Sequence, residues 1–119
     1  MRYPWGDALV PEAFDGHTLI FLLRPADAPA FDEAELERLQ AEHLAYLREL
    51  TRSGALIANG PLTAQTDDRL RGLSVYSVLL AEALELARRD PMVRAGRLEI
   101  HGGTWLTADG TAAFGASDP

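Results

Sequence analysis

The sequence contains no cysteine. This absence excludes disulfide bonds, thiolate nucleophiles and metal sites built on cysteine, although it leaves the redox compartment open. Long hydrophobic runs are missing as well, because no stretch reaches the roughly 18 apolar residues that a membrane span needs. Residues 1–6 also lack the continuous apolar segment of a signal peptide. We therefore expect a soluble cytoplasmic protein without a membrane partner.

Basic residues are few compared with acidic ones. The chain has 11 Lys and Arg residues against 18 Asp and Glu residues, which gives a formal net charge of −7 at pH 7. A nucleic acid carries a dense negative charge of its own and would be repelled by such a surface. The composition therefore argues against a nucleic acid as a partner.

The 119 residues are enough for one domain but too few for two. Apolar residues make up 47% of the chain, so it can fill a hydrophobic core and should not be disordered throughout. Prolines, glycines and aromatics without a period mark residues 1–16 as an irregular arm. Residues 17–106 should form the folded domain, and residues 107–119 should be a flexible tail.

Hydrophobic patterns predict the first half of the domain. A nearly unbroken apolar run that starts at His17 and ends before Arg24 is typical of a central strand. A helix should follow over about 32–52, because its leucines recur at helical spacing and acidic residues stand at its start. Residues 55–58 are typical of a short buried strand, which should run into a turn at 59–61.

The second half continues with strand, helix and strand. Alternating large and small residues over 71–78 predict a third strand that pairs with the second. A short helix over 80–89 should end before Pro91, because proline disfavours helical geometry in the residue that precedes it. The last strand should cover 97–106, with a bulge or bend at its adjacent glycines, 102 and 103.

This order of elements predicts a ferredoxin-like βαββαβ fold of the α+β class. Right-handed crossovers would place both helices on one face of a four-stranded antiparallel sheet. The other face would keep apolar side chains without cover. A second copy of the chain could cover them sheet to sheet, so we expect a homodimer.

His43 is the most informative single residue. At 100° per residue it falls inside the apolar stripe of the first helix, between Leu39 and Leu47, so its imidazole should face the sheet. One interpretation is a partly buried histidine that fills space and bonds a backbone carbonyl. The other is a general acid or base that lines a pocket between helix and sheet.

Asp90 also allows two interpretations. A carboxylate in the last turn of a helix opposes the negative end of the helix dipole, which is unfavourable unless a nearby group requires the charge. Asp90 followed by Pro91 is also the ordinary start of a new helical turn, in which the aspartate is the N-cap of residues 91–95. On local pattern alone the cap is favoured.

Other polar residues have weaker support. We expect His17 and His101 to be solvated or to lie at a strand edge. Arg24 at the end of the first strand, and Ser74 and Tyr76 in the third, could reach a pocket and hold an anionic or phenolic ligand. Surface or packing roles are the alternative for these three.

Motifs for several other chemistries are missing. No spacing of histidines and carboxylates indicates a metal site, and the glycine-containing segments lack the lysine and helix start of a phosphate loop. The serines at 53, 74 and 77 do not stand in a nucleophile elbow. We therefore expect no metal, nucleotide or redox cofactor.

Three segments together resemble the YCII-related domain family. The first, EHLAYL at 42–47, places a histidine on a helix, and the second, GALIANGP at 54–61, ends in Gly-Pro. The third, RDPMVRAG at 89–96, has Asp-Pro followed by a hydrophobic position and Ala-Gly. Each is weak alone, but all stand in the order and spacing of the family, and the resemblance spans about residues 17–106.

The resemblance implies a dimeric ferredoxin-like α+β barrel with a pocket that contains an active-site His-Asp dyad. By position the dyad is His43 and Asp90, and the Gly-Pro segment adds Gly60 and Pro61 to the candidate substrate-binding residues. Some relatives are lyases that remove hydrogen chloride from chlorinated hydroxylated aromatics, and the fold also resembles that of muconolactone isomerases. Many members have no assigned reaction, so the family implies a site more firmly than a substrate.

Two functional hypotheses follow. The first is a small cofactor-independent lyase or isomerase that moves a proton through the dyad, with elimination or isomerisation fitting better than phosphoryl or acyl transfer. The second is a non-catalytic domain that holds a small molecule in the same pocket or serves in dimerisation. A purely structural partner protein is a more distant third.

Overall fold

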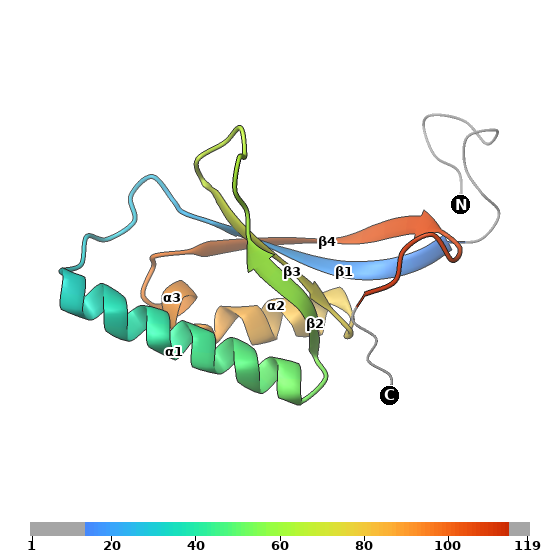
Figure 1. Ribbon diagram of the computed structural model, residues 1–119, viewed down its shortest axis with the longest axis horizontal. Helices are drawn as coiled ribbons and strands as arrows, with labels where there is room; N and C mark the ends of the chain where they lie inside the picture. The colour runs from blue at the N-terminus through green and yellow to red at the C-terminus, as the bar shows by residue number, and fades with distance from the viewer. Residues whose placement is uncertain (1–13, 115–119) are drawn as a thin grey trace.

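The computed structural model describes residues 14–114, which form a single α+β unit (Figure 1). The elements, in chain order, are β1 (Phe14–Leu23), α1 (Glu33–Arg52), β2 (Leu56–Pro61), β3 (Leu70–Tyr76), α2 (Leu80–Arg88), α3 (Pro91–Arg94) and β4 (Glu99–Ala108). No helix within the described part of the chain is long and apolar enough to cross a membrane.

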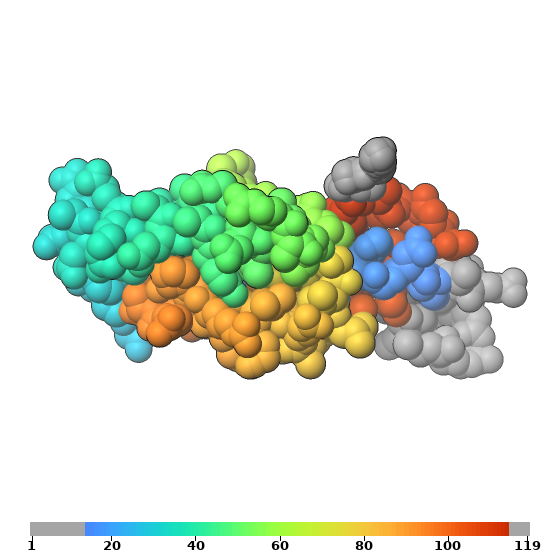
Figure 2. Space-filling view, turned by 90° about the horizontal axis from the view of Figure 1, so that it is seen from below, coloured from blue at the N-terminus to red at the C-terminus, as the bar shows by residue number. Residues whose placement is uncertain are grey.

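The strands form a four-stranded sheet in the order β2-β3-β1-β4, and all neighbouring strands are antiparallel. The helices lie on one face of this sheet (Figure 1), where α1 runs beside the segment that contains α2 and α3 (Figure 2). The predicted ferredoxin-like fold is confirmed, with α3 as a short addition before the last strand.

The long helix α1 forms where the leucine spacing predicts it. Asp32 is its N-cap, and the side chain accepts a hydrogen bond of 2.8 Å from the backbone N–H of Glu35. This bond satisfies one of the free N–H groups at the helix start. The inner face of α1 buries Leu39, His43 and Leu50 against the sheet, so the stripe that contains the histidine faces inward as expected.

The core between helices and sheet has two parts. The larger cluster contains Ile20 and Leu56, both fully buried, beneath Ala83 and Ala87 of α2. The small alanines let α2 approach the sheet closely. A smaller cluster packs Leu39, Met92 and Leu98 together beneath the first half of α1. His43 belongs to the same inner face of α1, between Leu39 and Leu50.

The first and last strands, β1 and β4, extend beyond the ends that the hydrophobic pattern predicts. β1 begins at Phe14 rather than His17, and β4 ends at Ala108 rather than Leu106. Their ladder runs without interruption from the pair Phe14↔Ala108 to the pair Leu23↔Glu99. Cross-strand pairing therefore extends the strands into segments that were assigned to the arm and the tail. The rest of the arm, including Trp5, lies outside the described residues.

The predicted turn at residues 59–61 is wrong, because β2 continues through Pro61. Gly60 pairs with Leu73 and Pro61 with Gly72. β2 is an edge strand. Proline has no backbone N–H, and an edge strand tolerates it because its outward-facing N–H groups make no ladder bonds.

The predicted bulge at the paired glycines of β4 is also wrong, because the register with β1 is regular there. A Cβ on Gly102 would lie 2.8 Å from Cδ1 of Leu80 and 3.1 Å from Cδ1 of Ile20. Gly102 is therefore explained by the close approach of α2 to the sheet. The register shifts that do occur lie between Leu22 and Leu23 and between residues 56 and 58.

His17 is half-buried and does not lie at a sheet edge, contrary to expectation. It lies in β1, an interior strand, and its Nε2 is 3.0 Å from Oγ1 of Thr107. Its ring also contacts Trp105 and Phe114, with centroid distances of 5.8 and 5.0 Å. His101 is exposed beside Glu99, as expected.

Candidate functional site

The structure brings His43 and Asp90 together. Nδ1 of His43, in the middle of α1, lies 2.6 Å from Oδ2 of Asp90, which precedes α3. Both residues are buried, with exposed fractions of 9% and 3%. A hydrogen bond to an ionised carboxylate is short and strong, so the contact holds the ring in one orientation.

Asp90 combines both roles that its sequence position allowed. Its other oxygen, Oδ1, accepts a 2.9 Å hydrogen bond from the backbone N–H of Met92. It is thus the N-cap of α3, with Pro91 at the first helical position. Because the cap fixes one carboxylate oxygen, the other is aimed at α1.

The carboxylate determines which ring nitrogen of His43 can do chemistry. A carboxylate only accepts, so Nδ1–H of His43 donates to Asp90 and a neutral ring carries its lone pair on Nε2. Nε2 has no hydrogen-bond partner within residues 14–114. A histidine whose Nδ1–H is held by a carboxylate in this way is chemically able to accept a proton at Nε2.

A cavity of about 390 Å³ lies beside His43, between α1 and the sheet. Its apolar lining comes from α1, α3, β1 and the residue that precedes β4: Leu22, Leu44, Leu47, Met92 and Leu98. Its polar lining comes from α1, from β2 and β3, and from the residue that follows β1: Arg24, Gln40, His43, Asn59, Arg71 and Ser74. An apolar pocket with a few convergent polar groups is typical of a site for a small molecule.

Most of the predicted substrate-binding residues reach this cavity. Arg24, Gly60, Pro61 and Ser74 all line it. Because β2 continues to Pro61 as a strand, its end forms a wall of the cavity.

Tyr76 does not line the cavity. It is buried in the larger core cluster, where it packs with Leu50 and Leu56. Burial raises the pKa of its phenol, and the nearby Tyr46 and Asp90 raise it further. Tyr76 therefore has a packing role, which was the alternative interpretation from the sequence.

Several lining residues were missed. Gln40 lies about one helical turn before His43 and lines the cavity. The helical spacing that placed His43 on the inner face could therefore have pointed to Gln40 as well. Arg71 lines the cavity because of the register shift in β3, which no sequence pattern marks. Arg97 lines an adjoining hollow of about 590 Å³ that shares Arg24 and Gln40 with the cavity.

Within residues 14–114, no group of three or more histidine or acidic side chains is arranged to hold a metal ion. Arg24 carries the clearest electrostatic perturbation at the site. Burial lowers the pKa of its guanidinium, and the positive charges of Arg97 and Arg71 lower it further. Arg24 and Arg71 therefore place positive charge in the wall of the cavity.

Comparison with known proteins gives a family and a structural likeness. A search of curated proteins found no match. Among solved structures, the chain is similar to 5-chloro-2-hydroxyhydroquinone dehydrochlorinase from Burkholderia phenoliruptrix, solved as a complex with 2,5-dihydroxybenzoquinone. The two are 21% identical, the match covers 76% of this chain and 90% of the other, and the TM-score is 0.49. The model of the YCII-related domain matches residues 19–101, and the chain therefore belongs to this family.

Proposed function

We propose that this protein is a lyase or isomerase that transfers a proton on a small substrate, with His43 as the general base and acid and Asp90 as its orienting partner. The observation that carries the proposal is the 2.6 Å contact between Nδ1 of His43 and Oδ2 of Asp90 beside a cavity. Imidazole suits both directions of proton transfer near neutral pH. Such transfer requires neither a metal nor a redox cofactor.

The chemistry would proceed from Nε2 of His43. This nitrogen takes a proton from a carbon next to a carbonyl, or from a phenol, and Asp90 stabilises the imidazolium that forms. In an elimination, the electron pair of the broken C–H bond forms a double bond, and a leaving group such as chloride departs with its own pair. In an isomerisation, the imidazolium returns the proton to another carbon. Both routes balance without another reactant.

The cavity supports a small cyclic substrate. Its volume of about 390 Å³ is at the lower end of the range for small-molecule sites, and its apolar walls suit a ring. Ser74 and Asn59 supply uncharged polar groups on the sheet side. Chlorinated hydroxyquinones and lactones, which the family resemblance suggests, are therefore the first substrates to screen.

The test compares variants of the dyad on a substrate found in this screen. His43→Ala and Asp90→Asn should each lower kcat by about 10² to 10⁴, the usual contribution of general acid–base catalysis and its orientation. His101→Ala is the matched control, because that histidine is exposed and pairs only with Glu99. Unchanged rates in both dyad variants would contradict the proposal.

The alternative is a non-catalytic domain that binds a small molecule in the same cavity. Native mass spectrometry of the purified protein with each screened compound separates the two. A compound that is bound and recovered unaltered, with no turnover by the wild type, would favour binding alone.

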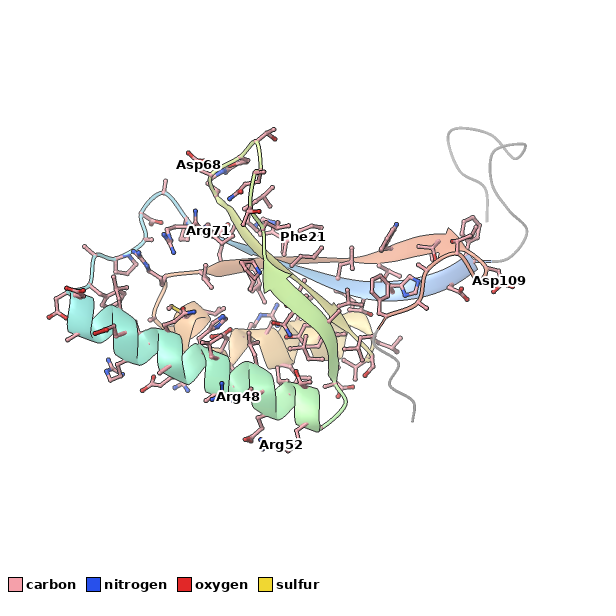
Figure 3. The ribbon with its side chains drawn as sticks, viewed as in Figure 1. Phe21, Arg48, Arg52, Asp68, Arg71 and Asp109 are labelled. Atoms are coloured by element: carbon pink, nitrogen blue, oxygen red, sulfur yellow. The ribbon has the colours of Figure 1, made fainter. Side chains whose placement is uncertain are left out.

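We also propose that the protein is a homodimer. Leu19 and Phe21 flank Ile20 of the core along β1 and pair with Val75 and Leu73 of β3, so strand alternation points these four apolar side chains to the sheet face opposite the helices. Figure 3 shows Phe21 on this face. A second copy is the partner that the family resemblance suggests, and burial of this face would supply the driving force.

A further inference from the structure

Arginines from separate segments gather around the candidate site. Arg24 follows β1, Arg71 lies in β3 and Arg97 precedes β4. Arg24 lines both the cavity beside His43 and the adjoining hollow, while Arg71 lines the cavity and Arg97 lines the hollow. Figure 3 shows Arg71 between the β2–β3 hairpin and the loop that follows β1.

The register shift of β3 brings Arg71 to this place. Leu22 pairs with Gly72 and Leu23 pairs with Leu70, so Arg71 is an extra residue without a partner on β1. In a regular strand, Arg71 and Gly72 would point to opposite faces. Here both line the same cavity, because a bulge redirects the side chain of the extra residue.

These like charges converge without a counter-ion. Among residues 14–114, no carboxylate lies within ion-pair distance of Arg24, Arg71 or Arg97. Glu33 and Glu37 line the adjoining hollow but form no ion pair with these arginines. The positive charges of Arg97 and Arg71 act against that of Arg24, and a bound anion would relieve this repulsion.

The guanidinium groups also have unused donors. Nε of Arg24 and Nε of Arg97 are buried without a hydrogen-bond partner. Arg97 reaches the carbonyl of Pro29 through Nη1, and Arg71 reaches the carbonyl of Asp68 through Nη1. A buried donor without a partner is costly, so such donors mark places where a partner is expected.

We propose that Arg24 and Arg71, with Arg97 beside them, form an anion-binding subsite that holds the carboxylate of a small cyclic substrate while His43 acts on its ring. A guanidinium matches the planar carboxylate with parallel N–H donors. The leucines that line the rest of the cavity suit the ring. This inference rests on the proposed function, because it takes the cavity beside His43 as the active site.

Calorimetric titration of the full chain with benzoate, and with benzamide as its neutral counterpart, tests the subsite. Benzoate should bind at least about tenfold more tightly than benzamide, and more weakly as salt is added. Arg71→Gln and Arg24→Gln should each weaken benzoate binding by at least about tenfold, with little effect on benzamide. Arg71 is exposed, so its variant tests the subsite even if the Arg24 variant folds poorly.

Two further variants separate this inference from the catalytic proposal. Arg94→Gln is the matched control, because Arg94 is exposed and lines neither hollow, and its benzoate affinity should equal that of the wild type. His43→Ala should still bind benzoate while losing turnover. Equal affinity for benzoate and benzamide, tighter binding of inorganic phosphate than of benzoate, or equal losses in Arg94→Gln and Arg71→Gln would overturn the subsite. None of these results depends on whether the dyad is catalytic.

Discussion

The carboxylate of Asp90 joins His43 on α1 to the start of α3. Oδ2 lies 2.6 Å from Nδ1 of His43, and Oδ1 receives the backbone N–H of Met92 at 2.9 Å. The same side chain therefore orients the candidate base and begins a helix. Stability and function should respond differently to changes at this position, because only one of its two bonds involves the imidazole.

Asp90→Ala should lower the free energy of unfolding by about 2 to 4 kcal/mol. The change removes a helix cap, worth about 1 kcal/mol, and leaves the buried imidazole without its acceptor, at about 1 to 3 kcal/mol. Asp90→Asn keeps an oxygen for the cap and should cost less. Urea denaturation followed by circular dichroism measures both.

Asp32→Ala is the matched control for the cap alone. Asp32 also caps a helix with one hydrogen bond, but it is exposed and contacts no histidine. Its replacement should cost about 1 kcal/mol. If Asp90→Ala cost no more than Asp32→Ala, the bond to His43 would contribute nothing to stability.

Local patterns in the sequence predicted most of the fold. The leucine spacing of α1 also placed His43 on its buried face, because a helix position depends only on residues nearby. The partner of His43 could not be found in this way. Asp90 is 47 residues away, and its local pattern favours a cap, which it is, without revealing the second bond. The family resemblance, not the pattern, suggested the pair.

The errors share a physical cause, which is tertiary contact. The Gly102–Gly103 pair in the sequence suggested a bulge, but Gly102 is needed because α2 packs closely against the sheet at this position. Pro61 is typical of a turn, yet an edge strand accommodates it. Arg71 reaches the cavity only because of a register shift between β1 and β3. None of these facts is encoded within a few neighbouring residues.

Gly102→Ala should destabilise the protein by about 1 to 3 kcal/mol, as overpacking of a core does. The added methyl would lie 2.8 Å from Leu80, 3.1 Å from Ile20 and 3.2 Å from Leu84, so α2 or its side chains must shift. Gly103→Ala is the matched control, since a Cβ there would meet nothing within 4 Å. Thermal unfolding of both variants checks this, and equal melting temperatures would show that α2 does not press on the sheet at Gly102.

Alkaline pH should destabilise the fold through Tyr76. Burial raises the pKa of its phenol above the ordinary value of 10.0, so above about pH 10 the unfolded chain loses a proton that the folded chain keeps. Stability is therefore intact below this pH and falls as pH rises, by at most about 1.4 kcal/mol per pH unit for one proton. The chain has no lysine to obscure this effect.

Tyr76→Phe should flatten this decline in urea unfolding measured between about pH 8 and pH 11. Tyr46→Phe is the comparison, because its hydroxyl donates a 2.7 Å hydrogen bond to the carbonyl of Leu86. That variant should lose about 1 kcal/mol at neutral pH as well. An unchanged slope in Tyr76→Phe would mean that the buried phenol does not control alkaline stability.

Phe21→Asp should convert the expected dimer to a monomer. Phe21 lies on the sheet face opposite the helices (Figure 3), and a carboxylate there would have to be desolvated in a sheet-to-sheet interface. Sedimentation should give twice the chain mass of 13.0 kDa for the wild type and the single mass for the variant. Leu79→Asp is the matched control, because Leu79 is 83% exposed at the start of α2 and should leave the dimer intact. A wild-type species of single mass at micromolar concentration would contradict the dimer, whereas dissociation by Leu79→Asp alone would move the interface to the helical side.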